Sequence, residues 1–154
     1  MTTLRPQKDA KAIYQDVLDT MDAHIENGAF DAFAARIILP YRVQTHETTH
    51  HVEDRSQLRA GFDDMRHRMT LRNIARRSRH CASATFKDAT TIEGHHITWL
   101  VTDDHTIVES YQVSNTLACS DGLWCIAGNG YSGEPDRLPL HMIEAMTRLA
   151  QQSD

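Results

Sequence analysis

The first third of the chain repeats its apolar positions with a helical period. Steps of three and four residues run from about Lys8 to Glu26, and Gly28 follows, which predicts an amphipathic helix that ends at a glycine. Its apolar positions are Ala12, Ile13, Val17, Leu18, Met21 and Ile25. The segment Phe30–Leu39 predicts a short second helix, which Pro40 would end because proline cannot extend the helical hydrogen bonds.

The next segment changes to β-branched residues. Val and Thr are frequent from Tyr41 to Asp54, which favours a short hairpin or a bent strand. Ser56 then has the character of a helix cap, and a third helix is predicted to about Asn73. Its apolar stripe comprises Leu58, Phe62, Met65, Met69 and Leu71.

The remainder reads as extended chain interrupted by turns, which predicts an antiparallel meander. Pro139 is expected to open a final helix. Helices followed by consecutive strands predict one α+β domain over residues 1–154, in which helices cover one face of a curved antiparallel sheet and leave a pocket. The ends, 1–7 and 151–154, are expected to fray. The strand-like runs are 74–87, 92–102, 106–118 and 123–131.

Charge is distributed unevenly along the sequence. The net charge is -5, yet the segment from Arg55 to His80 holds eight Arg against only Asp63 and Asp64. Because the chain is acidic overall, we do not expect a nucleic-acid partner. A solvated face, a subunit contact and an anionic small ligand remain the alternatives for this basic strip.

Other features of the sequence bear on location and cysteine chemistry. The first residues lack the apolar core of a signal peptide, and no stretch reaches the ~20 apolar residues of a membrane span, so a cytoplasmic protein without a membrane partner is expected. Cys81, Cys119 and Cys125 form no C-x-x-C pair, which predicts idle thiols rather than disulfides or a cysteine zinc site.

One string matches a metal motif. His46-Glu47-Thr48-Thr49-His50 has the H-E-x-x-H spacing of zinc proteases, which requires a helix. The segment reads as a strand, where the two histidines would lie ~13 Å apart, so no protease is expected. A different metal site remains an alternative to surface histidines; it would combine His46, His50 or His51 with His80, His95 or His96.

The last strands suggest acid/base residues. If Thr102 lies opposite Thr106, then His95, Ile97, Trp99 and Val101 share a face with Glu109, Tyr111, Val113 and Asn115. A carboxylate on a mostly apolar face can exchange a proton near neutral pH, because desolvation disfavours its charge. Glu109 is therefore the predicted proton carrier, with Tyr111, His95 or Asn115 as hydrogen-bond partners; the alternative is a Glu109 that pairs with an arginine or faces water.

The order of these elements resembles that of the nuclear transport factor 2-like, or SnoaL-like, superfamily. The residues Asn27-Gly28-Ala29-Phe30-Asp31-Ala32 resemble its turn between the first two helices, and Ser120-Asp121-Gly122-Leu123-Trp124-Cys125-Ile126 resemble the start of its last strand. The resemblance implies a cone-shaped α+β domain, a homodimer formed through the outer sheet face and a pocket inside the cone.

The superfamily includes isomerases, cyclases, dehydratases and non-catalytic proteins, so fold alone implies no reaction. At the positions of the ketosteroid isomerase catalytic groups this chain holds Met21, Asn115 and Pro40, so that chemistry is not expected. The first hypothesis is a cofactor-independent acid/base enzyme acting on a small apolar or carbonyl-bearing molecule, and the second is a non-catalytic ligand-binding or accessory subunit. Trp99, Asn115, Met21 and Ile97 are the predicted pocket lining.

Overall fold

The structure, a computed structural model, describes residues 9–45 and 48–132. The helix predicted from Pro139, both expected frayed ends and the motif residues His46 and Glu47 lie outside these residues. The helices are α1 (Ala10–Glu26), α2 (Phe30–Ala35) and α3 (Arg55–Leu71). The strands are β1 (Ile37–Gln44), β2 (Thr49–Val52), β3 (Ile74–Asp88), β4 (Thr91–Thr102), β5 (Ile107–Ser120) and β6 (Leu123–Ser132).

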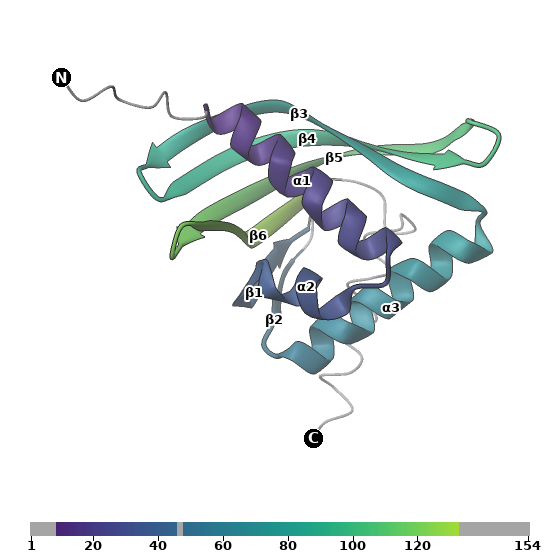
Figure 1. The fold of residues 1–154 in the computed structure, drawn as a ribbon, viewed down its shortest axis with the longest axis horizontal. Coiled ribbons are helices and arrows are strands. Elements are labelled where there is room, and N and C mark those ends of the chain that lie inside the picture. Colours follow the sequence, from purple (N-terminus) through teal and green to yellow (C-terminus); the bar gives the residue numbers. More distant parts are fainter. Residues whose placement is uncertain (1–8, 46–47, 133–154) are drawn as a thin grey trace.

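The strands form one curved sheet in the order β2-β1-β6-β5-β4-β3 (Figure 1). The four long strands from β3 to β6 pair antiparallel to their neighbours in sequence, as predicted, and the helices precede them. β1 pairs parallel to β6, which joins the β1–β2 hairpin to the meander. The predicted α+β architecture is therefore confirmed.

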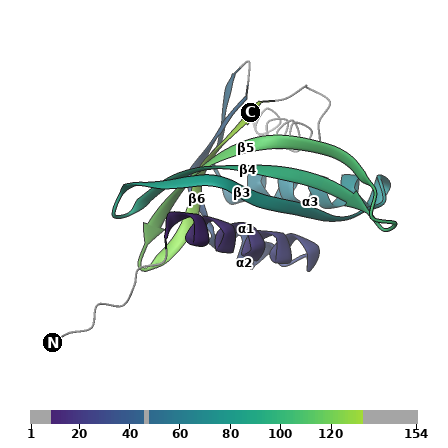
Figure 2. The same ribbon diagram turned by 90° about the horizontal axis from the view of Figure 1, so that it is seen from above.

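Helix α1 covers one face of the sheet. Figure 2 shows α1 and α2 on the same side of the strands. Asp9 caps the start of α1 by accepting a hydrogen bond from Ala12 N at 2.7 Å, and the positive φ of Gly28 follows its end. The buried side of α1 carries Tyr14, Val17, Leu18, Met21 and Ile25, so most of the predicted apolar stripe faces the strands. Ala12, which was predicted as part of the stripe, is exposed.

Helix α3 begins with a capping box at Asp54, two residues before the cap predicted from the sequence. Asp54, rather than Ser56, is the cap: its carboxylate accepts from Gln57 N at 2.9 Å, while Gln57 Oε1 accepts from Asp54 N. Leu71 is 67% exposed, so it does not belong to the predicted stripe. The physical reason is position, since Leu71 is the last residue of the helix.

The second helix is shorter than predicted. It ends at Ala35, and the residues Ile37-Ile38-Leu39 belong to β1 instead. Pro40 therefore lies within a strand, at the point where the pairing of β1 with β6 shifts register between Ile37 and Arg42. Proline donates no ladder hydrogen bond, and a register irregularity is where a strand tolerates it. Pairing with β6 thus overrode the local helical pattern.

No helix in the part of the chain that the structure describes is long and apolar enough to cross a membrane.

Candidate functional site on the inner sheet face

A β-bulge in the β4–β5 hairpin decides which side chains share a face. The predicted turn is correct, since Thr102 N donates to Thr106 O at 3.0 Å and Val101 pairs with Ile107. The register then shifts, so that Leu100 pairs with Glu109 and Val108 is the extra residue. A one-residue shift reverses the faces of one strand relative to the other.

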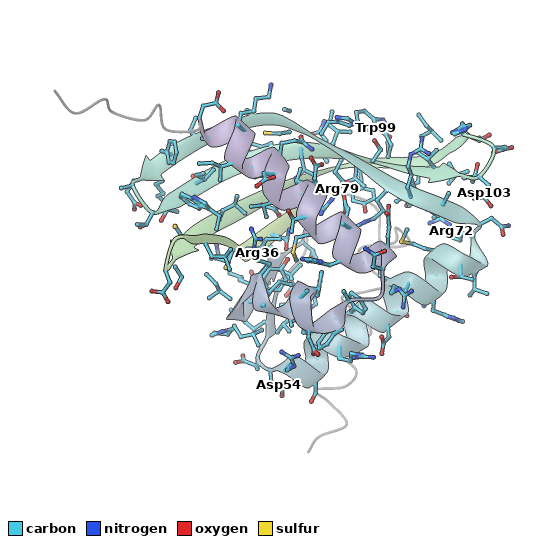
Figure 3. All side chains as sticks on the ribbon, in the orientation of Figure 1. Arg36, Asp54, Arg72, Arg79, Trp99 and Asp103 are labelled. Atoms are coloured by element: carbon cyan, nitrogen blue, oxygen red, sulfur yellow. The ribbon has the colours of Figure 1, made fainter. Side chains whose placement is uncertain are left out.

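The prediction that His95, Ile97 and Trp99 share a face with Glu109 is therefore wrong. These three pair with Ser114, Gln112 and Ser110, and lie on the outer face of the sheet. Trp99 packs against the ring of His80 there, with ring centroids 5.3 Å apart. In Figure 3, Trp99 lies apart from α1, whereas Arg79 lies beside that helix. His95 and Trp99 consequently cannot join Glu109 in one site within a single chain.

The inner face, on which α1 packs, is formed by cross-strand rows with a high polar content. Directly paired residues share a face, so the pairing assigns these rows without ambiguity. One row contains Arg77, Leu100 and Glu109, and the next contains Arg79, Thr98 and Tyr111. The third contains Cys81, His96 and Val113, and the fourth contains Ala84, Gly94, Asn115 and Asn129.

A tyrosine and a histidine form a buried pair between α1 and β4. The hydroxyl of Tyr14 lies 2.7 Å from Nδ1 of His96, and both side chains are at most 1% exposed. Burial lowers the pKa of His96 to about 2, and the charges of Arg79, Arg77 and His95 act in the same direction. At neutral pH, His96 is therefore an uncharged group that can form hydrogen bonds but does not act as a general base.

Gly94 provides the space for this pair. A Cβ at this position would lie 2.6 Å from Cδ2 of Tyr14 and 3.0 Å from the carbonyl oxygen of Ser83. The ring of Tyr14 therefore lies directly over the glycine, two residues before His96 on the same face of β4. Any larger residue at position 94 would displace the phenol from the histidine.

Three polar side chains on this face each bury an atom without a hydrogen-bond partner among the residues described. They are His96 through Nε2, Thr98 through Oγ1 and Asn115 through Nδ2, and each side chain is at most 2% exposed. His96 and Thr98 are two residues apart on β4, about 6.6 Å. Asn115 lies diagonal to His96 across β4 and β5, within about 8 Å. Buried polar groups are nearly always paired in native proteins, so three neighbouring exceptions mark this region as a candidate binding site.

A buried ion cluster adjoins the polar rows. Asp22 of α1 accepts hydrogen bonds from Arg77 at 2.8 Å and from Arg79 at 3.1 Å. The side chains of both arginines are 8% exposed and that of Asp22 is 14% exposed. Arg79 lies directly opposite Thr98 in the sheet. The cluster therefore brings two guanidinium groups and one carboxylate to the edge of the candidate site.

Of the other residues predicted for the inner face, Glu109 and Tyr111 do lie on it, as do Val113 and Asn115. Arg72 donates to Glu109 at 3.4 Å, and the Glu109 side chain is 13% exposed. Burial raises the pKa of Tyr111, while Arg77 and Arg79 oppose that shift. Tyr111 is thus a neutral hydrogen-bond donor at neutral pH, and Glu109 has the arginine partner that the alternative interpretation expected.

A surface groove of about 630 Å³ runs between α1 and the edge strand β3. Gln15 crosses this groove and satisfies two backbone groups of the strand edge: it donates to Arg79 O at 2.9 Å and accepts from Cys81 N at 2.8 Å. Arg77, Arg79 and Cys81 all line the groove. The groove therefore reaches the strand positions that lie directly opposite Leu100, Thr98 and His96.

The basic strip noted in the sequence is divided among separate ion pairs. Six of its eight arginines contact a carboxylate, and Arg66 lies over the ring of Phe62 at 5.9 Å. The pairs are Arg55 with Asp31, Arg59 with Asp63, Arg68 with Asp64, Arg72 with Glu109, and both Arg77 and Arg79 with Asp22. The strip is thus not one continuous basic surface, because β3 and α3 direct its members to different partners.

Within residues 9–45 and 48–132, no three His, Cys, Asp or Glu side chains converge as metal ligands, and the three cysteines are free thiols. His50 and His51 lie on β2, a strand, as their segment predicted.

Tyr14, His96 and Thr98 were not predicted for the inner face, and His96 entered the sequence analysis only as a possible metal ligand. Tyr14 lies seven residues before Met21, and therefore on the same buried side of α1, where a phenol needs a polar partner. His96 and Thr98 alternate with Ile97 on β4, but their face depended on the bulge at Val108. Met21 and Asn115, predicted as pocket lining, are buried at 1% and 2% exposed, and their role in a pocket stays a prediction.

Solved structures with the same fold come from several bacteria. A protein of unknown function from Mycobacterium tuberculosis is 15% identical, with a TM-score of 0.58 over 92% of this chain and 88% of that chain. A protein of unknown function with a cystatin-like fold from Nostoc punctiforme is 14% identical, with a TM-score of 0.59 over 82% and 92%. A ketosteroid isomerase-like protein from Erwinia carotovora is 11% identical, with a TM-score of 0.56 over 79% and 94%.

No protein-family model and no curated protein matches the sequence. At these identities the similarity shows the fold alone. The chain has the fold of the nuclear transport factor 2-like superfamily, which confirms the resemblance of its element order. Proteins with this fold include isomerase-like members and members of unknown function, so the reaction or ligand must be argued from residues.

Proposed function

We propose that this chain binds a small polar organic molecule against the inner face of its sheet, through His96, Thr98 and Asn115. The observation that carries the proposal is the group of three buried, unpartnered polar atoms on neighbouring positions of β4 and β5. Each unpartnered group costs about 1–3 kcal/mol of desolvation, which a bound molecule with matching polar atoms would offset. Binding pockets combine apolar walls with a few convergent polar groups of this kind.

Binding is favoured over acid/base catalysis by the protonation states on this face. Neutral His96 has a pKa of about 2, far below the range in which a general base operates at neutral pH. Burial raises the pKa of Tyr111, so the phenol holds its proton. These groups can orient a ligand by hydrogen bonding without exchanging protons with it.

A second candidate function is cofactor-independent proton transfer on the same ligand, with Glu109 as the proton carrier. Glu109 lies two residues from Tyr111 on the inner face, and its charge contributes to the raised pKa of that tyrosine. The ion pair with Arg72 gives the carboxylate a structural role that does not require catalysis. For any ligand found, conversion by the wild type and no conversion by Glu109→Gln would support this candidate; unchanged ligand with both would remove it.

Thermal-shift screening of small carbonyl-, hydroxyl- and carboxyl-bearing metabolites tests the binding proposal. Adjacent histidines on opposite faces of β4 offer a matched control: His96→Phe should abolish ligand stabilisation, whereas His95→Phe should retain it. Equal loss in both variants, or retained binding in His96→Phe, would contradict the inner-face site. Because His96→Phe can also disturb the packing of Tyr14, Thr98→Val serves as the second inner-face variant, and binding that it leaves unchanged would contradict the proposal as well.

The homodimer implied by the family resemblance remains a proposal. The outer sheet face carries Trp99, Ile97 and His80, which supports an interface there, since aromatic residues are enriched in such surfaces. Light scattering of the purified chain would test it, and a mass of about 17.5 kDa at high concentration would show a monomer.

A further inference from the structure

The unpartnered atoms of the inner face have the character of donors. The amide oxygen of Asn115 already accepts from Asn129 Nδ2, so its unpartnered atom is the amino group. A phenol is a stronger proton donor than an imidazole N–H, which favours the tautomer in which Tyr14 donates to Nδ1 of His96 and Nε2 of the neutral ring carries the proton. The Thr98 hydroxyl can donate as well. A molecule that satisfies these donors must present acceptor oxygens.

The charges around these donors are predominantly positive. Asp22 supplies one carboxylate to the two guanidinium groups of Arg77 and Arg79, all three largely buried. The other inner-face carboxylate, Glu109, is paired with Arg72. Among the described residues these two groups therefore contain one more positive than negative charge. Buried charges act strongly on neighbouring groups, because little water screens them.

This positive charge reaches the donors directly. Arg79 lies opposite Thr98 in the sheet, and Thr98 lies opposite Tyr111. Burial is the main cause of the lowered pKa of His96 and of the raised pKa of Tyr111; the charges of the same two arginines act to lower both pKa values, which places both side chains within their field. A negatively charged ligand at the inner face would be attracted, whereas a cationic one would be repelled.

We infer that the ligand is a small carboxylate, whose oxygens accept hydrogen bonds from His96 Nε2 and Thr98 Oγ1, two residues apart on β4, beside the Asp22–Arg77–Arg79 cluster. This inference rests on the proposed binding function and adds the chemical class of the ligand. Charge-assisted hydrogen bonds to a carboxylate are about twice as strong as neutral ones. A carboxylate should therefore bind in preference to an amide or alcohol of the same shape.

Matched probe pairs test the inference. Acetate with acetamide, and benzoate with benzamide, differ in charge but hardly in size. Each is titrated into the isotopically labelled full chain at neutral pH, while NMR follows the signals of His96, Thr98 and Asn115. At least one acid should shift these signals and bind at least tenfold more tightly than its amide, with affinity that falls as salt is added.

Two variants keep the test specific. Thr98→Val removes one proposed donor and should weaken acid binding at least fivefold, whereas Thr116→Val, on the outer face of β5, should leave the dissociation constant unchanged. Equal binding of acid and amide at these signals would overturn the carboxylate inference and leave the binding function standing. No shift at the three residues with any probe would also overturn the inference, and a negative metabolite screen would then remove the proposed function itself.

Discussion

Replacing Thr98 with valine should make the protein more stable, which is the opposite of the usual outcome for a buried residue. Thr98 is 1% exposed, and its hydroxyl has no partner within the part of the chain that the structure describes. Valine has nearly the same shape, so the substitution removes an unsatisfied polar group without opening a cavity. A buried hydroxyl without a hydrogen bond costs about 1–3 kcal/mol, and recovery of the lower value is expected.

This free energy converts to a measurable shift in melting temperature. An unfolding entropy of about 2.1 cal/mol/K per residue over the 154 residues gives about 0.32 kcal/mol/K. A gain of about 1 kcal/mol therefore raises the melting temperature by about 3 °C. Differential scanning calorimetry of the ligand-free wild type and variant, at the same protein concentration and pH, resolves a difference of this size.

The control is a threonine at the end of the same strand whose hydroxyl is satisfied. Thr102 Oγ1 accepts from Thr106 N at 3.2 Å, so Thr102→Val should lower the melting temperature. If Thr98→Val lowers it by a similar amount, the Thr98 hydroxyl has a structural partner and the reasoning for an inner-face site fails. If Thr98→Val is stabilised and also binds carboxylates less tightly, the hydroxyl serves the ligand rather than the fold.

Three further substitutions test the parts of the site separately. Asp22→Asn removes the carboxylate charge that two buried arginines share and should cost about 3 kcal/mol or more in urea denaturation. Asp63→Asn, in an exposed pair, should cost under about 0.5 kcal/mol, and similar costs for the two variants would refute the buried cluster. In the unfolded state His96 gains a proton at about pH 6.5, whereas in the folded state it does so only at about pH 2. The wild type should therefore lose about 2 kcal/mol of stability between pH 7 and pH 5, and His96→Phe should not. Parallel pH profiles of the two proteins would count against a neutral buried ring. Gly94→Ala should lower the free energy of unfolding by about 1–3 kcal/mol, because the added methyl group displaces Tyr14. In a Tyr14→Leu background this loss should largely vanish. An undiminished loss there would exclude the contact with Tyr14 as the cause.

Several features of this protein followed from local sequence alone. The apolar period of α1, the glycine after it and the turn residues between the long strands predicted this helix and the meander with boundaries close to those observed. These signals are local, because helical period and turn chemistry depend on residues a few positions apart. The order of the elements then sufficed to indicate the cone-shaped fold.

The composition of the inner face was decided by the tertiary structure. Val108 forms a bulge only because β5 pairs with β4, and this single extra residue places His96 and Thr98 inside and Trp99 outside. The segment before Pro40 joined a strand because β6 offered a partner. Strand pairing and ion pairs connect residues far apart in sequence, as Asp22 connects to Arg77 and Arg79. Such contacts leave no periodic signal in the chain, so the sequence determined which residues are available and only the folded sheet determined which of them meet.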